Sequence, residues 1–426
     1  MSVSFRLGRG LGALIPMLLM SSLAMADPPP PARSLTLSRA LSLAHENNQV
    51  AEAARMRIGE AQGVLTTASV LLVRNPRLSF ETGPRSSNTA GTSLDLGIRL
   101  QQRFEIAGQR SRRRALARAQ LAATRASAED VQRVIDLAVA QTFYSALTSQ
   151  RRLTLFEESE HLATQLRDIA GRRVNAGEGV PLEIATARIR LAEAQRRRIM
   201  ARVAGQTALV RLATLLGMPA SPELALQGDL PGAENVLSGQ ALLARAVEGR
   251  PDLAAATRRV DAAREAVRLA NSEAWPDVTI GVSLRREGDE EIALAGLRVP
   301  IPFFQRNQGE RQRSRAALQR RQAEATALRL QVESEASQAL LAYEQARLAV
   351  DLYDAEVLRA QDESVSLLET AFAAGEIGIA DVIVMQREVL VGRQGYLAAR
   401  QALALARAAL LAAAHLSQTQ ALSGAQ

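Results

Sequence analysis

Residues 278–301 read VTIGVSLRREGDEEIALAGLRVPI, and this stretch decides which fold the chain can adopt. Apolar residues occupy every second position from Val278 to Leu284, and again from Ala293 to Ile301. Such alternation is typical of a β-strand with one apolar face. The polar stretch 287–291 between the two runs predicts a turn. We therefore expect a β-hairpin within residues 275–303, with strands of about 9–12 residues, long enough to cross a bilayer when tilted.

A second hairpin is predicted nearer the N-terminus, within residues 75–106. Leu78, Phe80 and Thr82 alternate with polar or charged residues, and the same alternation recurs over 94–100. The polar stretch 83–91 is expected to form the turn between these two strands.

The two hairpins belong to two copies of one sequence unit. Residues 75–78 (NPRL) correspond to 275–278 (WPDV), and the AGE triplet at 176–178 recurs at 374–376. A duplication of this length indicates two similar structural halves. Each half is expected to contain a helix, a hairpin and two long helices. The expected bounds are 27–236 for the first repeat, with helices at 36–72, 110–170 and 181–217, and 237–426 for the second, with helices at 251–273, 306–374 and 379–416.

The long helices cannot belong to a compact globular domain. Neither 111–170 nor 310–374 contains glycine or proline. A helix of that length spans roughly 90–100 Å. Apolar residues recur every seventh position from Leu318 to Leu367, which is the stride of a coiled coil. The helices are therefore expected to pack along partner helices.

Residues 1–26 have the pattern of a cleaved secretory signal peptide. Arg6 and Arg9 precede the apolar stretch 11–23, and Ala24-Met25-Ala26 has the small-x-small form of a cleavage site. The alternative is a retained anchor, for which the segment is short and interrupted by Pro16. We expect the chain to be exported.

The composition excludes most chemical functions. The chain has no Cys and three His, so disulfides, thiolate chemistry and the common metal motifs are not expected. No phosphate-binding loop or nucleophile motif is present. We expect no catalytic residue, no cofactor site, no metal site and no enzyme activity. All 52 basic residues counted as Lys or Arg are arginines, and the net charge is +8. Because these arginines alternate with acids along the helices, nucleic-acid binding is not expected.

Four amphipathic strands are too few for a membrane barrel in one chain, since the smallest outer-membrane barrels use about eight. An open sheet edge is not tolerated in lipid. Several copies must therefore pool their strands. The predicted fold class is mainly α with a small membrane β part. Three chains would contribute four strands each to a 12-stranded trimeric β-barrel, and their long coiled-coil helices would form a trimeric α-helical barrel.

The sequence resembles the TolC-like outer-membrane factors over essentially all of the expected mature chain. At the two helix turns, Gly177 with Glu183-Ile184 and Gly375 with Asp381-Val382 resemble the recurrent glycine, five residues, acid, aliphatic pattern of this family. The stretch VPIPFFQRNQG at 299–309 is similar to the branch that serves heavy-metal pumps of the cobalt-zinc-cadmium type. Many members carry a lipidated N-terminal Cys. This chain departs from that pattern, and we expect it not to be lipidated.

The resemblance implies a passive exit duct in the outer membrane, with its helical part in the periplasm. The implied partners are two further copies of the chain, a periplasmic adaptor, an inner-membrane resistance-nodulation-division pump and outer-membrane lipid. Heavy-metal cations are the implied cargo. A drug-efflux or type I secretion duct of the same fold remains open. A periplasmic coiled-coil adaptor or structural protein is the alternative from another class, but it does not account for two bilayer-length hairpins.

Three groups of residues are candidate functional sites. The resemblance implies that the turns after the long helices form the periplasmic entrance where an adaptor docks, although plain helix capping explains the same residue types. The entrance candidates are Arg172, Arg173, Asn175, Gly177, Glu178, Glu183, Gly375, Glu376 and Asp381. An acidic extracellular rim is one interpretation of Glu287, Asp289, Glu290 and Glu291, and a plain solvated hairpin turn is the alternative that the sequence favours. Membrane-interface aromatics are predicted at Phe80, Phe104, Trp275, Phe303 and Phe304, with the preference of aromatics for strands as the alternative.

Basic residues follow each hairpin and are expected just below the barrel. There they would meet anionic headgroups of outer-membrane lipid or lie on a solvated helix face. The two groups are Arg110, Arg112, Arg113 and Arg114, then Arg306, Arg311, Arg313 and Arg315.

Overall fold

The structure is a computed structural model that describes residues 34–87, 91–219, 224–234, 239–353 and 355–419. The signal peptide predicted at 1–26 lies outside these residues. The helices are α1 (Leu37–Asn47), α2 (Gln49–Ser69), α3 (Gln109–Asn175), α4 (Pro181–Leu215), α5 (Gly239–Gly249), α6 (Pro251–Ser272), α7 (Gln308–Asp351), α8 (Ala355–Ala373) and α9 (Ile379–Ala413). The strands are β1 (Ser34–Leu35), β2 (Arg77–Ser87), β3 (Gly91–Phe104), β4 (Ala225–Leu226), β5 (Val278–Glu287) and β6 (Glu290–Arg298).

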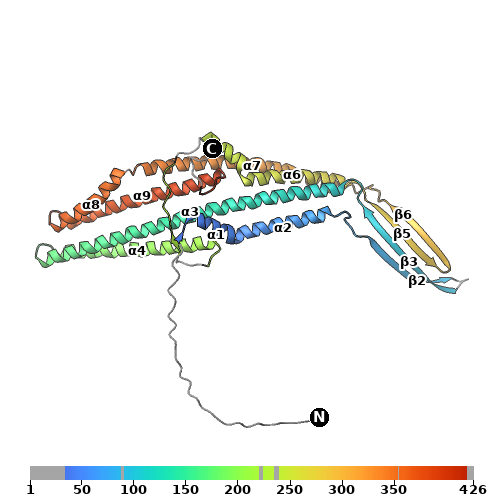
Figure 1. The fold of residues 1–426 in the computed structure, drawn as a ribbon, viewed down its shortest axis with the longest axis horizontal. Helices are drawn as coiled ribbons and strands as arrows, with labels where there is room; N and C mark the ends of the chain where they lie inside the picture. Colours follow the sequence, from blue (N-terminus) through green and yellow to red (C-terminus); the bar gives the residue numbers. More distant parts are fainter. Residues whose placement is uncertain (1–33, 88–90, 220–223, 235–238, 354, 420–426) are drawn as a thin grey trace, which may run out of the picture.

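The described chain is a long rod (Figure 1). The strands β2, β3, β5 and β6 lie at one end, and the turns α3–α4 and α8–α9 lie at the other. The 67-residue helix α3 spans about 100 Å on its own. Both halves place a helix, a hairpin and long helices in the same order. The predicted fold class, a mainly helical and internally duplicated chain with two hairpins, is confirmed.

The two hairpins join into one antiparallel sheet with the strand order β2-β3-β5-β6. The strand β2 runs to Ser87, so the predicted bounds of the turn, 83–91, start too early. Pro84 lies inside β2, which is an edge strand of this sheet, the kind of strand in which proline is found. The strand β6 ends at Arg298, so Val299 and Ile301 lie beyond the strand in which their alternation placed them.

The helix predicted at 36–72 is two helices with a break at Asn48. The Asn48 side chain accepts hydrogen bonds from the amides of Val50 and Ala51 at 2.9 and 3.1 Å, and its Nδ2 donates to the Leu215 carbonyl at 2.8 Å. It therefore caps α2 and ties this helix to the end of α4.

The second repeat breaks at the corresponding place, Arg250, which precedes Pro251. The helix α5 on the other side of this break was not predicted. Arg250 is buried and binds Asp252 at 2.5 Å and Glu335 of α7 at 2.7 Å. Burial by itself raises the pKa of Asp252, but the hydrogen bonds and charge of Arg250 outweigh it, so the pKa of this carboxyl is lowered.

The helix predicted at 306–374 is also interrupted, whereas α3 runs past its predicted end at 170 through Gly171 to Asn175. At the break between α7 and α8, the Tyr353 ring lies 5.5 Å from the Tyr396 ring of α9. The Tyr353 hydroxyl occupies the space beside Gly395, where a Cβ would lie 2.5 Å away. Any larger residue at 395 would therefore require the Tyr353 ring to shift.

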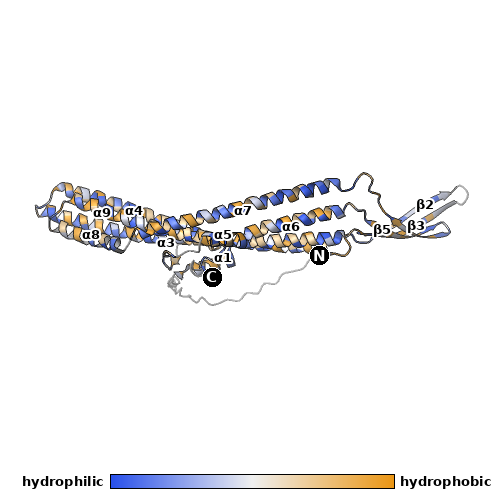
Figure 2. Cartoon of the chain, turned by 90° about the horizontal axis from the view of Figure 1, so that it is seen from above, coloured by the Kyte–Doolittle hydropathy of each residue, from blue (hydrophilic) through white to orange (hydrophobic). Residues whose placement is uncertain are grey.

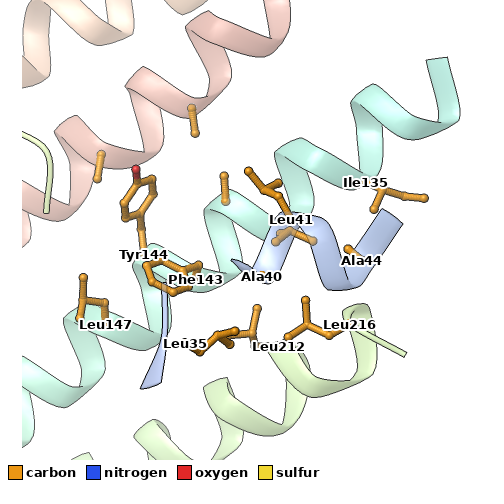
Figure 3. Close-up of a cluster of buried hydrophobic side chains, with 14 of the residues drawn as sticks. Leu35, Ala40, Leu41, Ala44, Ile135, Phe143, Tyr144, Leu147, Leu212 and Leu216 are labelled. Atoms are coloured by element: carbon orange, nitrogen blue, oxygen red, sulfur yellow. The ribbon is translucent and has the colours of Figure 1, made fainter. Parts of the chain in front are cut away.

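The core lies at the middle of the rod, where the short elements pack on the long helices (Figure 3). Alanines such as Ala40 and Ala44 lie among the larger residues of this cluster and allow the helices to approach closely. Each fully buried leucine contributes about 1.5–3 kcal/mol of hydrophobic stabilisation. The labelled members are Leu35, Ala40, Leu41, Ala44, Ile135, Phe143, Tyr144, Leu147, Leu212 and Leu216.

The end of α4 against α1 should be a sensitive point of this core. Gly217 has a φ of +67°, and a Cβ there would lie 2.3 Å from the Asn47 carbonyl oxygen. Gly217→Ala should lower the free energy of unfolding by about 2 kcal/mol or more, because it combines a strained backbone with a backbone clash. Thermal melts followed by circular dichroism measure this.

Gly63→Ala is the matched control, since Gly63 lies inside α2 and a Cβ there would meet no atom within 4 Å. It should leave stability unchanged or raise it by up to about 1 kcal/mol. Equal melting temperatures for the two variants would contradict the packing described at Gly217.

Candidate functional site

The sheet has one apolar and one polar face, and the strand register places the two sets of residues. Leu78 pairs with Leu100, and Leu100 pairs with Val282, so these side chains lie on the same face. We call this surface the apolar face. Its large members are all exposed: Leu78, Phe80, Leu94, Leu96, Ile98, Leu100, Ile280, Val282, Leu284 and Leu297. A contiguous exposed apolar surface of this kind marks a membrane or protein contact.

Both edges of the sheet are free within the described chain. The strand β2 pairs only with β3, and β6 pairs only with β5. Unpaired amide and carbonyl groups along an edge are a template for a further strand. The sheet is therefore incomplete on its apolar face and at its two edges.

The predicted interface aromatics lie mostly at one level. Phe104 ends β3, Trp275 precedes β5, and Phe303 packs edge-on against Phe304 at 4.9 Å just after β6. All four therefore lie at the end of the sheet that adjoins the helices. Phe80 differs, because it pairs with Ile98 inside the sheet. The sequence placed these five residues near strands but did not separate Phe80 from the rest.

The predicted acidic rim includes arginines that the sequence did not reveal. Glu287 ends β5 on the polar face of the sheet, where it binds Arg85 of β2 and lies 3.6 Å from Arg285. Arg85 also binds Asp95 at 3.0 Å. The other acidic side chains of this turn, Asp289, Glu290 and Glu291, are exposed. The hairpin turn is thus less acidic than its own residues suggest, because the neighbouring hairpin neutralises Glu287.

The two helix turns at the far end have the same backbone geometry. Gly177 and Gly375 have φ values of +79° and +80°. The amide of Glu178 donates to the Arg173 carbonyl at 2.9 Å, and the amide of Glu376 donates to the Ala371 carbonyl at 2.9 Å. These are the bonds of the Schellman motif, which favours glycine because the conformation is left-handed.

The next helices also begin alike. Glu183 and Asp381 occupy the third position of α4 and α9, where a carboxylate is favoured by the helix dipole. The Gly378 amide donates to the Asp381 carboxylate at 3.3 Å. Asp381 therefore caps α9, whereas α4 has no side-chain capping bond.

Arg173 joins the two turns. Its Nη1 donates to the Phe372 carbonyl at 2.9 Å, and its guanidinium carbon lies 5.2 Å from the centre of the Phe372 ring. The Phe372 side chain is 1% exposed and packs in a cluster with Leu166 of α3 and Val382 of α9. Val382 and Ile184, the matched aliphatic residues of the two turns, therefore both belong to the contact between the helix pairs. Val382 is buried in the cluster, and Ile184 packs at its margin.

The other entrance candidates lie on the surface of the turns. Arg172, Asn175, Glu178 and Glu376 are exposed, and no ion pair joins them to one another in the described part of the chain. Phe372 was missed by the sequence reasoning, which sought charges at the turns. Its apolar character at a helix end was the only signal in the sequence.

Several of the arginines expected to meet lipid headgroups or lie on a solvated helix face make contacts within the chain. Arg110 donates to the carbonyls of Ser69 and Val70, and Arg113 binds Glu105 at 2.7 Å. Arg311 donates to Asn271 and Arg313 pairs with Glu310. The contacts of Arg110 and Arg311 tie the starts of α3 and α7 to the ends of α2 and α6.

The described residues contain no group of three or more His, Cys, Asp or Glu side chains placed to hold a metal ion. Among them, no helix combines the length and apolar character needed to cross a membrane. Figure 2 shows polar and apolar residues mixed along the helices.

Arg173→Met should loosen the contact between the two turns, because it removes a charge-assisted hydrogen bond and a cation–π contact worth about 1–3 kcal/mol together. Hydrogen–deuterium exchange of residues 370–382 should become faster. Arg172→Met, which removes an exposed guanidinium one residue away, should leave this exchange unchanged. Equal exchange in the two variants would contradict a joining role for Arg173.

The chain resembles proteins of known type over most of its length. It is 28% identical over 389 residues to the cobalt-zinc-cadmium resistance protein CzcC of Cupriavidus metallidurans, a match that covers 88% of this chain and 89% of that protein. It is also 28% identical to the pyoverdine export outer membrane protein OpmQ of Pseudomonas putida, over 58% of this chain and 55% of that protein.

Among solved structures, the outer-membrane channel OprN superposes with a TM-score of 0.75 at 19% identity, covering 90% of this chain and 91% of that chain. At this identity the likeness establishes a shared fold. The family described as outer membrane efflux protein matches residues 40–218 and 242–414. These two segments make up most of the sequence and correspond to its two repeats. The chain belongs to the outer membrane efflux protein family.

Proposed function

We propose that this chain is the passive outer-membrane duct of a tripartite efflux pump and that it works as a homotrimer. The observation that carries the proposal is the incomplete sheet, which has an exposed apolar face, a polar face and two free edges. Pairing the β6 edge of one copy with the β2 edge of the next removes both free edges. With four strands per copy, three copies give a closed barrel of about twelve strands, within the size range of outer-membrane barrels.

In this assembly the apolar face contacts lipid and the polar face lines a water-filled passage. The aromatic side chains at the helix end of the sheet lie at the periplasmic interface between membrane and water. The long helices continue the passage into the periplasm, and their paired turns form its entrance. An inner-membrane pump of the resistance-nodulation-division class supplies the energy, and a periplasmic adaptor docks at the entrance.

We propose heavy-metal ions as the cargo, in keeping with the relative CzcC, whose name assigns it to cobalt, zinc and cadmium resistance. The described chain offers no metal-binding cluster, and a water-filled duct needs none, since selectivity lies mostly with the pump. The likeness to the pyoverdine exporter OpmQ, over a shorter stretch, makes an organic solute the second candidate.

The membrane role of the apolar face is tested by placing a charge on it. Leu100→Asp, in an all-apolar row with Leu78 and Val282, and Ile280→Asp should abolish recovery of the protein from the outer-membrane fraction. A charge facing lipid is costly, by about 2–4 kcal/mol per copy for Arg or Lys and less for a carboxylate. Ser283→Asp places the same charge on the polar face of β5 and should assemble normally. Normal assembly of all three variants would contradict the proposed orientation.

The cargo is tested in the host by deleting the gene. The deletion strain should become more sensitive to cobalt, zinc or cadmium, because ions delivered by the pump no longer leave the periplasm. A plasmid carrying the wild-type gene should restore growth, and one carrying Leu100→Asp should not. Unchanged metal tolerance together with new sensitivity to drugs, or loss of siderophore export, would replace the metal cargo with an organic one.

A further inference from the structure

Four arginines gather where the polar face of the sheet meets the helices. Arg77 begins β2, Arg103 lies near the end of β3, Arg298 ends β6, and Arg74 precedes β2. Together with polar side chains they line an open depression of about 470 Å³. The polar members of its lining are Asn75, Gln101 and Thr279.

The strand register explains why these side chains converge. Thr279 of β5 lies between Arg103 on β3 and Arg298 on β6, so the three form one row across the sheet. In the adjoining row, Gly281 pairs with Gly296. These two glycines line a neighbouring depression on the same face of the sheet, and a Cβ at Gly296 would meet no atom within 4 Å.

At the level of the depression the arginines outnumber their acidic partners. Farther along the polar face, arginines and acidic residues are paired. Arg85 binds Asp95 and Glu287, and Arg99 lies 3.7 Å from Glu81. At the depression, Arg103 pairs with Asp277 at 2.5 Å.

Within the described residues, no acidic side chain lies within ion-pair distance of Arg74, Arg77 or Arg298. All three are exposed. Each copy therefore presents three guanidinium groups without an acidic partner in the described chain, gathered around one open depression.

We propose that Arg74, Arg77 and Arg298, with the Thr279 hydroxyl and the Gln101 amide, form a binding site for oxyanions such as phosphate or carboxylate groups. Guanidinium groups bind such oxyanions through paired hydrogen bonds, which an ammonium group cannot reproduce. The inference rests on the proposed function, because in the trimer three copies of the site form a basic ring around the passage.

A ring of like charge within a passage of low-dielectric walls raises the local concentration of counter-ions, by about tenfold or more. Free divalent cations are repelled at this level. The cargo that passes the ring most readily is a solute with carboxylate or phosphate groups, or a metal ion bound to such a ligand. The site thus selects for the ligand of the metal rather than for the bare ion.

The experiment uses the full-length protein, purified in detergent and reconstituted in planar bilayers of zwitterionic lipid at low ionic strength, where screening is weak. The reversal potential in a potassium chloride gradient should show preference for chloride over potassium. Arg74→Gln/Arg77→Gln/Arg298→Gln should remove or invert this preference. Arg286→Gln, which removes an arginine from the opposite face of β5, should keep it.

Inorganic phosphate distinguishes a true oxyanion site from simple charge. Millimolar phosphate, added to the chloride solution, should reduce the wild-type chloride current by occupying the ring. The triple variant Arg74→Lys/Arg77→Lys/Arg298→Lys should retain the chloride preference but lose most of the phosphate effect. Equal phosphate effects in the arginine and lysine proteins would reduce the proposal to a charged ring without a binding site.

The lipid composition of the bilayer shows whether the oxyanion comes from solution or from a lipid headgroup. Phosphate in solution should act with zwitterionic lipid alone, since the site faces the passage. An effect that required anionic lipid would place the site at the membrane surface and overturn the proposal. A conducting trimer without chloride preference would overturn this inference alone, whereas a monomer that forms no pore would overturn the proposed function itself.

Discussion

The structure depends on one constraint: a single chain supplies neither a cover for the apolar face of its sheet nor hydrogen-bond partners for the sheet edges. The apolar face of β3 and β5 has no covering layer, and the outer edges of β2 and β6 have no partner within the described residues. Hydrocarbon can cover the face, but it offers no hydrogen bonds to an edge. Only further strands can do so, and further copies of the chain are the simplest source. The proposed assembly of several copies follows from these unpaired strand edges more directly than from any individual side chain.

The long helices likewise need partners, in this case neighbours that pack along the rod. A helix of 67 residues gains little from local propensity and needs neighbours along its length. The core at the middle of the rod meets this need within the chain, and Arg173 and Phe372 meet it at the turns. Because the chain is duplicated, both halves use the same turn and cap geometries. The halves differ at Tyr353, where α7 gives way to α8 beside Gly395.

Much of this was predictable from the sequence, and the misses have physical reasons. The strands were predictable because alternation is a local signal. The pairing of β3 with β5 was not, since contacts between distant segments leave no local pattern, and the partners of Glu287 were missed with it. The break at Asn48 was hidden because its side chain caps one helix while binding another. In the second copy, Pro251 marked the start of the corresponding helix. The basic depression was hidden as well, because Arg77 and Arg298 lie far apart in the sequence and come together only through the order of the strands.

The central claim, that several copies share one barrel, is tested most directly by the mass of the extracted protein. The protein would be recovered from the outer-membrane fraction in a mild detergent, and its mass determined by light scattering corrected for bound detergent. The shared sheet predicts about three chains per particle, since twelve strands lie within the barrel range and four do not. A particle of one chain, or recovery as a soluble periplasmic monomer, would contradict the shared barrel and favour a coiled-coil adaptor.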